Sequence, residues 1–123
     1  MTADNFVINS RKISGENYPY IIAEVSANHN GSINRAKQII LAALNAGVDA
    51  VKIQTYTPDT MTIDVSKPDF LINNGLWEGR SLYDLYSEAY TPFEWHRELF
   101  LYAKEIGITL FSSPFDETAV DLL

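Results

Sequence analysis

Cysteine is absent from the 123 residues of the sequence. A disulfide framework and a zinc site ligated by cysteine are therefore both excluded. Long apolar runs are also missing, since no stretch approaches the roughly 20 residues that a membrane-spanning helix needs. The first residues lack the basic start and apolar run that are typical of a secretory signal peptide. We therefore expect a cytoplasmic protein with no membrane partner.

Positive charge is scarce in this sequence. The chain has 9 Lys and Arg residues against 16 Asp and Glu residues, which gives a formal net charge of −7. A nucleic-acid-binding surface requires a basic patch, so the sequence predicts no nucleic-acid partner. An anionic small molecule remains compatible with this charge, because one lysine inside a cleft can outweigh the average field around it.

The length and composition are those of one small folded domain. Hydrophobic residues make up 46% of the chain and charged residues 20%, and 123 residues suffice for a core. We expect residues 1–19 to form an extended N-terminal segment, with a β-prone run at residues 6–8 and a turn at residues 14–17. Residues 20–123 are expected to form the domain itself.

Polar residues follow the first predicted strand, residues 20–26, at the point where it ends. Glu24 lies on the face opposite Ala23 and Val25, and the polar loop Asn28-His29-Asn30-Gly31 comes next. Ser32 is the predicted N-cap of the helix that follows. A carboxylate beside such a loop is typical of an α/β active site. A buried strand with a paired Glu24 and an ordinary turn is the structural alternative.

Helices and strands alternate through much of the remaining chain. Apolar residues at three- and four-residue spacing predict helices over residues 33–46 and 91–106, each followed by a glycine, and another from residue 117. Period-two patterns predict strands over residues 49–55 and 108–113. The two helix-to-strand joints resemble each other, which indicates a repeated βα unit with parallel strands.

One helix start carries a strong local signal. Thr91, Pro92 and Glu94 have the spacing of a capping box, which predicts Thr91 as the N-cap and Pro92 as the first helical residue. Residues 56–90, which precede it, form a long insertion with a short helix after Ser81. We interpret the aromatic stripe of that helix as packing rather than as a binding platform.

The repeated βα unit is compatible with a (β/α)₈ barrel and with an open doubly wound sheet. No glycine-rich phosphate-binding fingerprint follows the first strand, and polar residues end all three strands, so the barrel is favoured. A complete barrel has eight strands and about 250 residues. The predicted fold is therefore α/β, the N-terminal part of a TIM barrel with about three βα units, within a larger enzyme.

The ends of the three strands are expected to bring eight polar residues to one rim, namely Glu24, Asn28, His29, Asn30, Lys52, Gln54, Ser112 and Ser113. A lysine can neutralise a phosphate or carboxylate, and a serine can donate to the same oxygens. A glutamate can accept from a hydroxyl or move a proton. The residues alone would equally fit a Schiff-base aldolase with Lys52 as nucleophile.

Three ordered motifs resemble the sialic acid synthase family over about residues 20–123. They are residues 22–32 (IAEVSANHNGS), 46–55 (AGVDAVKIQT) and 111–116 (FSSPFD). Within that family the insertion most resembles the pseudaminic acid synthase branch, at residues 54–61 (QTYTPDTM), 75–86 (GLWEGRSLYDLY) and 88–92 (EAYTP).

The resemblance implies an enzyme that condenses phosphoenolpyruvate with an N-acylated amino sugar and releases phosphate. For the pseudaminic acid branch the implied sugar is a 2,4-diacetamido-2,4,6-trideoxy-altrose. Synthesis of N-acetylneuraminate or legionaminic acid is the alternative within the family. The resemblance also implies a divalent metal, Mn²⁺ or Mg²⁺, and a homodimer for full-length members.

The resemblance also implies roles for individual residues. Lys52 and Ser113 would contact phosphoenolpyruvate, and Glu24 and Gln54 would contact the acceptor sugar, with Glu24 as the catalytic residue. Asn28 is a further candidate for substrate binding.

The family's two metal-ligating histidines come from later strands, so we expect no metal ligand in this chain. His29 is expected to shape the loop or to contact substrate, and His96 lies on a helix. The chain would then be catalytically incomplete by itself. A truncated, non-catalytic product is the alternative.

Overall fold

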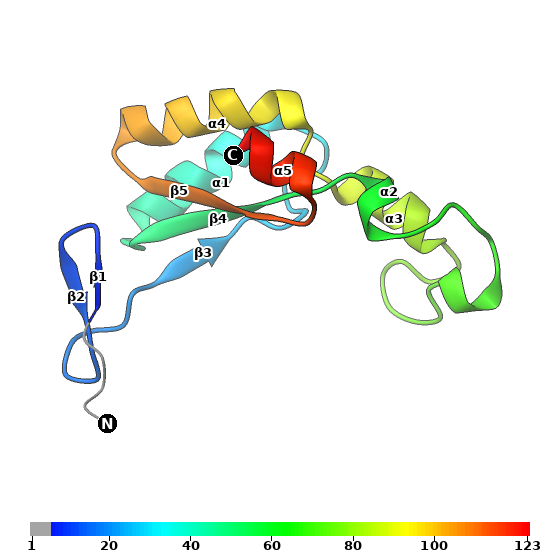
Figure 1. The fold of residues 1–123 in the computed structure, drawn as a ribbon, viewed down its shortest axis with the longest axis horizontal. Coiled ribbons are helices and arrows are strands. Elements are labelled where there is room, and N and C mark those ends of the chain that lie inside the picture. Colours follow the sequence, from blue (N-terminus) through cyan, green and yellow to red (C-terminus); the bar gives the residue numbers. More distant parts are fainter. Residues whose placement is uncertain (1–5) are drawn as a thin grey trace.

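A three-stranded parallel sheet with helices on one face forms the body of the molecule. The computed structural model describes residues 6–123, and α1 and α4 lie side by side on the same side of the sheet (Figure 1). The strand order is β3-β4-β5. The elements of this body are β3 (Ile22–Glu24), α1 (Ile33–Asn45), β4 (Ala50–Thr55), α4 (Phe93–Ile106), β5 (Thr109–Pro114) and α5 (Glu117–Leu122). The predicted βα repeat is confirmed, with a first strand shorter than expected.

The register of the sheet places the polar residues of neighbouring strands next to one another. Glu24 of β3 lies opposite Lys52 of β4, and Gln54 of β4 lies opposite Ser113 of β5. Both pairings are parallel, as the repeated βα unit predicts. Because successive side chains of a strand point to opposite faces, these four residues share one face of the sheet.

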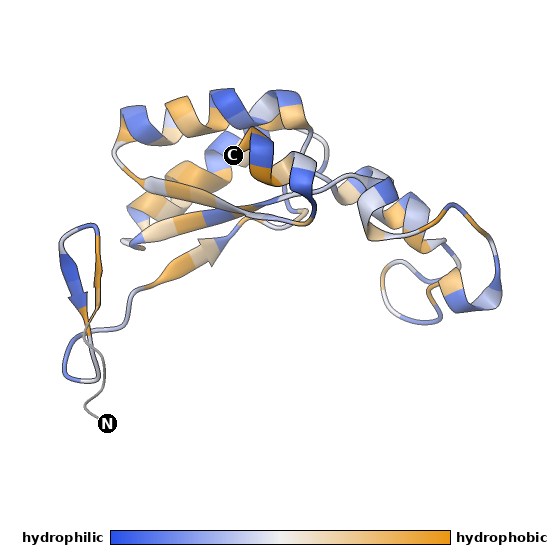
Figure 2. Ribbon diagram, viewed as in Figure 1, coloured by the Kyte–Doolittle hydropathy of each residue, from blue (hydrophilic) through white to orange (hydrophobic). Residues whose placement is uncertain are grey.

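The other face of the sheet packs against the helices and forms the hydrophobic core. Val51 and Ile53 of β4 are at most 1% exposed, and Ile40 of α1 and Leu99 of α4 are fully buried in the same cluster. Figure 2 shows apolar residues recurring along both helices, as an amphipathic helix requires. Within residues 6–123, none of the helices has the length and apolar character needed to cross a membrane.

The two ends of α1 follow the sequence signals. The Ser32 side chain accepts a hydrogen bond from the Arg35 backbone N–H, which satisfies one of the free donors of the first turn. At the other end Gly47 has a φ of +80°, a left-handed conformation that glycine adopts without a steric cost. Both predicted boundaries of this helix are confirmed.

The predicted capping box of α4 is wrong. The helix begins at Phe93 with Pro92 as its N-cap, and no side chain caps it. Pro92 has a ψ of 136°, so it is extended rather than helical. Its carbonyl accepts from the Trp95 backbone N–H and from His96 Nδ1, so these bonds hold the first turn in place of the Thr91 hydroxyl. Thr91 itself is 2% exposed.

Residues 6–13 form a β-hairpin rather than a single extended run. Strands β1 (Phe6–Ile8) and β2 (Arg11–Ile13) pair antiparallel. Asn9 and Ser10 both have positive φ, the requirement of a type I′ hairpin turn. Arg11 forms an ion pair with Asp49, just before β4, so the hairpin is held near the amino ends of the strands. Residues 1–5 of the predicted N-terminal segment lie outside the described residues.

The insertion extends from the carboxyl end of β4 (Figure 1). It contains the short helices α2 (Pro58–Met61), η1 (Pro68–Phe70) and α3 (Leu82–Ala89). Ser81 caps α3 by accepting from the Asp84 backbone N–H, as predicted. Tyr56 packs edge-on against Tyr86 of α3 and against Phe115, with ring centroids 5.8 and 5.5 Å away. This aromatic group therefore packs the insertion onto the body.

Candidate substrate site

Glu24 and Lys52 lie next to each other on the face of the sheet opposite α1 and α4, which we call the open face. Lys52 Nζ lies 2.9 Å from Glu24 Oε1, and their side chains are 27% and 47% exposed. An ion pair with this much exposure contributes at most about 1 kcal/mol to folding. The pair therefore adds little to the stability of the sheet, and both groups stay accessible to a ligand.

Gln54 and Ser113 extend this site toward the carboxyl ends of the strands. They are opposite each other on β4 and β5, two residues beyond the row of Glu24 and Lys52. All four are only partly buried or exposed. Together they offer a carboxylate, an ammonium, an amide and a hydroxyl on one surface. That combination can bind an anionic group and sugar hydroxyls side by side.

Asn28 lies in the loop after β3 and is engaged with the backbone. Its side-chain amide donates to the Val25 carbonyl at 3.0 Å, and Arg35 Nε donates to the Asn28 carbonyl at 2.9 Å. Positive φ values at Ser26 and Asn30 make the tight bends of this loop. The structure thus shows Asn28 shaping the loop, and a contact with substrate remains a prediction.

His29 packs beneath the same loop. It is 1% exposed, its ring meets Trp95 edge-on at 5.5 Å, and its Nδ1 accepts from the Gly31 backbone N–H at 3.2 Å. Burial lowers the pKa of His29, and this outweighs the Ala89 backbone, which raises it. The ring is therefore neutral near pH 7, with its proton on Nε2. This arrangement is that of a loop-shaping residue.

Ser112 does not join the open face, which corrects the expectation that both serines lie at the rim. Its Oγ lies 2.5 Å from Thr55 Oγ1, and Thr55 Oγ1 lies 2.7 Å from His96 Nε2 on the helix side. Ser112 alternates with Ser113 along β5, so only one of them can face the site. The sequence signal for this placement was that Ser112 lies two positions from the buried Leu110 and therefore shares its face of the strand. No sequence signal indicated the role of His96.

The model of the NeuB family matches residues 39–123, which is more than half of the chain. The chain belongs to the NeuB family. This match spans the strands that carry Lys52, Gln54 and Ser113.

Curated members of the NeuB family resemble most of this chain. The pseudaminic acid synthase of Campylobacter jejuni subsp. jejuni serotype O:2 is 54% identical over 85% of the chain and 30% of its own length. The pseudaminic acid synthase of Helicobacter pylori is 48% identical over 85% of the chain and 31% of its own length. The chain thus spans about a third of the length of these relatives.

Solved structures of the family share the fold of this chain. The N-acetylneuraminic acid (sialic acid) synthetase of Leptospira borgpetersenii serovar Hardjo-bovis, in complex with citrate, has a TM-score of 0.76 at 25% identity. It covers 98% of this chain, which corresponds to 38% of that protein. The three βα units therefore match part of the TIM barrel of that synthetase, and the predicted fold class is confirmed.

Residues 6–123 form no metal centre by themselves. Residues 6–123 hold no group of three or more His, Asp or Glu side chains placed to bind a metal ion. His29 accepts a backbone N–H, and His96 bonds to Thr55 and Pro92. The described residues thus do not fit the divalent metal that the resemblance implies, and no step of the chemistry is assigned to a metal here.

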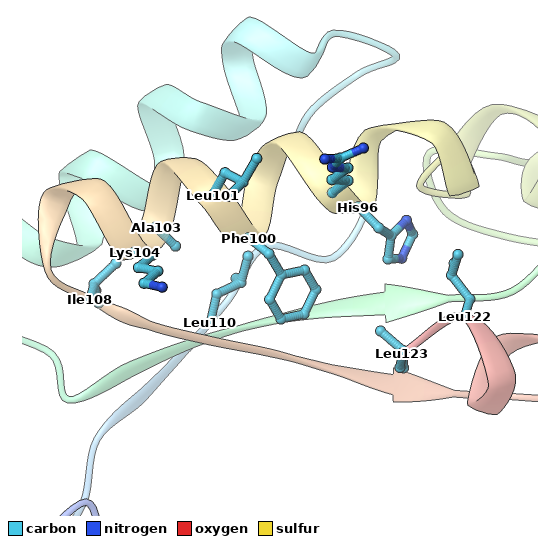
Figure 3. A pocket seen from close by; sticks show the side chains of 10 residues that line it. His96, Phe100, Leu101, Ala103, Lys104, Ile108, Leu110, Leu122 and Leu123 are labelled. Carbon is cyan, nitrogen blue, oxygen red and sulfur yellow. The ribbon is translucent and has the colours of Figure 1, made fainter.

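An apolar groove of about 660 Å³ lies on the helix side of the sheet, away from the site. Figure 3 shows Phe100 of α4, Leu110 of β5 and Leu122 and Leu123 at the end of the chain around it. Leu110 shares the helix-side face with Val51, its partner in the register. The other lining residues are His96, Arg97, Leu101, Ala103, Lys104 and Ile108, so no Asp, Glu, Ser, Thr or Tyr side chain lines the groove.

Proposed function

We propose that this chain carries part of the substrate site of a pseudaminic acid synthase. The reaction condenses phosphoenolpyruvate with 2,4-diacetamido-2,4,6-trideoxy-altrose to give pseudaminic acid and phosphate. The observation that carries the proposal is the placement of Glu24, Lys52, Gln54 and Ser113 on one face, in a chain 54% identical to a protein of that name. The metal ligands and dimer contacts belong, in this proposal, to parts of the enzyme beyond residues 1–123.

Lys52 and Ser113 bind phosphoenolpyruvate in this proposal. The ammonium of Lys52 neutralises a phosphate or carboxylate oxygen, and the Ser113 hydroxyl donates to a neighbouring oxygen. Lys52 is ion-paired and 27% exposed. A Schiff-base lysine is instead activated by desolvation or by a cationic neighbour, so Lys52 suits anion binding better than the aldolase role.

Glu24 and Gln54 bind the acceptor sugar through its hydroxyl and amide groups. The C3 carbon of phosphoenolpyruvate attacks the sugar aldehyde, water adds at C2, and the resulting tetrahedral intermediate loses phosphate. Glu24 is placed beside the bound anion and can hold or move a proton at a sugar hydroxyl. Asn28 lies in the loop that borders this position.

A chimeric enzyme tests the proposal. Residues 1–123 replace the matching part of the Campylobacter jejuni relative, and phosphate release is measured with phosphoenolpyruvate and each candidate sugar. We expect turnover of the diacetamido-altrose. Lys52→Met should lower kcat/KM at least about 100-fold, because an ionic contact to the substrate is lost.

Lys104→Met is the matched control, because Lys104 is exposed on α4 and lines the groove on the helix side of the sheet. It should leave kcat/KM within about twofold, as is usual for a surface substitution. Equal losses in both variants would contradict the role of Lys52. A preference for N-acetylmannosamine or for the legionaminic acid precursor would overturn the assigned sugar while leaving the family reaction in place.

A further inference from the structure

A network of hydrogen-bonded side chains lies on the helix side of the sheet, directly behind the candidate site. Thr55, the last residue of β4, is fully buried, and its Oγ1 lies 2.7 Å from His96 Nε2 and 2.5 Å from Ser112 Oγ. His96 is 3% exposed and its Nδ1 lies 3.1 Å from the Pro92 carbonyl. This hydrogen-bonded network thus links the first turn of α4 to the carboxyl ends of β4 and β5.

The partners fix the direction of these bonds. A carbonyl can only accept, so His96 Nδ1 carries the proton and donates to Pro92. His96 Nε2 then accepts from the Thr55 hydroxyl, so the Ser112 hydroxyl is left to donate, with Thr55 Oγ1 at 2.5 Å and the Ile53 carbonyl at 3.1 Å as its two acceptors. Burial lowers the pKa of His96, against the opposing hydrogen bonds to the Pro92 and Phe93 backbone, and so favours this neutral form.

Two residues of this network are sequence neighbours of residues on the open face. Thr55 follows Gln54 in β4, and Ser112 precedes Ser113 in β5, while Gln54 and Ser113 are opposite each other. The Phe115 backbone N–H also donates to the Thr55 carbonyl at 3.1 Å. Because side chains alternate along a strand, a bond on the helix side constrains where the next side chain lies on the open side.

We propose that Thr55, Ser112 and His96 are positioning residues that hold Gln54 and Ser113 at a fixed separation for substrate binding. The positioning itself follows from the geometry, and its use for phosphoenolpyruvate and sugar rests on the proposed function. The Thr55 hydroxyl is the central link because it joins β4 to both other members. Its removal leaves the backbone pairing of β4 and β5 in place but loses the side-chain bonds that tie their carboxyl ends to each other and to α4.

The test compares Thr55→Val with Thr55→Ser in the labelled 123-residue chain by nuclear magnetic resonance. Valine keeps the shape but removes the hydroxyl, and serine keeps the hydroxyl. In Thr55→Val we expect the His96 ring nitrogens to lose the signature of an accepting Nε2. The Gln54 side-chain amide and the Ser113 backbone amide should shift or broaden, and Thr55→Ser should restore both signals.

Unchanged Gln54 and Ser113 signals in Thr55→Val would overturn the proposal, and so would equal changes in both variants. Ser112→Ala provides a second test should Thr55→Val fail to fold, with the same two signals expected to change. In the chimeric enzyme, Thr55→Val should lower kcat/KM about tenfold, the loss of roughly one hydrogen bond, and Thr55→Ser should recover it. An inactive unsubstituted chimera would count against the proposed function alone, because the resonance test does not depend on turnover.

Discussion

The two histidines of the chain show how burial changes a residue's chemistry. His29 and His96 are 1% and 3% exposed, and burial lowers the pKa of both. Each uses one ring nitrogen as an acceptor, His29 for a backbone N–H and His96 for a hydroxyl. Protonation of His29 would turn its acceptor into a donor and oppose that bond.

Folding should consequently weaken as the pH falls below about 6.5, the ordinary pKa of histidine. The unfolded chain binds protons there more readily than the folded chain, so the free energy of unfolding is largest above this pH and declines below it. Each histidine contributes a slope of at most about 1.4 kcal/mol per pH unit. Urea unfolding at pH 7.5 and pH 5.5 measures the change.

Between pH 7.5 and pH 5.5 the change in the free energy of unfolding reports on the histidines rather than on the carboxyl groups, because ordinary carboxyl groups titrate near pH 4. Asp116 titrates lower still, since the hydrogen bond from the Ala119 backbone and the one from Thr60 lower its pKa. Following the two rings directly by resonance gives the control. A titration midpoint at or above 6.5 for either histidine would contradict the prediction.

The alternation of side chains between the two faces of a strand explains much of what the sequence predicted about the site. The alternation of β4 predicted Lys52 and Gln54 on one face and Val51 and Ile53 on the other, and the structure shows both. What the sequence could not provide was the partner of each polar group. The bonds of Thr55 to Ser112 and His96 join residues 57 and 41 positions apart, and no local pattern encodes such contacts.

Among the elements, α4 carries one buried and one exposed leucine that can be compared directly. Leu99 is fully buried in the cluster that includes α1 and the sheet, while Leu101 is 58% exposed. The helix also shows the limit of local signals. Its capping box matched the sequence pattern, but the bonds accepted by the Pro92 carbonyl determined where the helix begins.

Leu99→Ala should lower the free energy of unfolding by about 2–5 kcal/mol, through lost burial and the cavity left behind. Leu101→Ala, the matched control on the same helix, should change it by no more than about 0.5 kcal/mol. Both replace leucine with alanine, so helix propensity is nearly unaffected. Urea unfolding followed by circular dichroism measures both, and similar losses would contradict the assigned packing.

At the scale of the whole molecule, the sheet has one strand paired on both sides and two paired on one side. Among residues 6–123, β4 lies between β3 and β5, and nothing pairs with the outer edge of either. An unpaired edge presents free N–H and C=O groups at every second residue. The open face, which carries Glu24 and Lys52, is likewise the face without helices.

Hydrogen exchange should reveal this asymmetry. Successive amides of β4 over Ala50–Lys52 should all exchange slowly, because β4 is paired with both β3 and β5 there. The amides of Thr109–Ser113 in β5 should alternate between slow and fast, with a difference of at least about tenfold. Residue-resolved exchange of the chain in heavy water measures the pattern. Uniform protection along β5 would mean that its outer edge is paired, for instance by a second copy of the chain.

The insertion leaves β4 and the chain returns through α4 to β5, so the length of the insertion sets the entropy of closing the chain between these two strands. Glu24 and Lys52, opposite each other across β3 and β4, are 28 positions apart, whereas Lys52 and Phe111, opposite each other across β4 and β5, are 59 apart. Each doubling of a closed loop costs only about 0.6 kcal/mol of entropy. A change in the length of this segment therefore costs the sheet little closure entropy, provided that the contacts of Tyr56 with Tyr86 and Phe115 are kept.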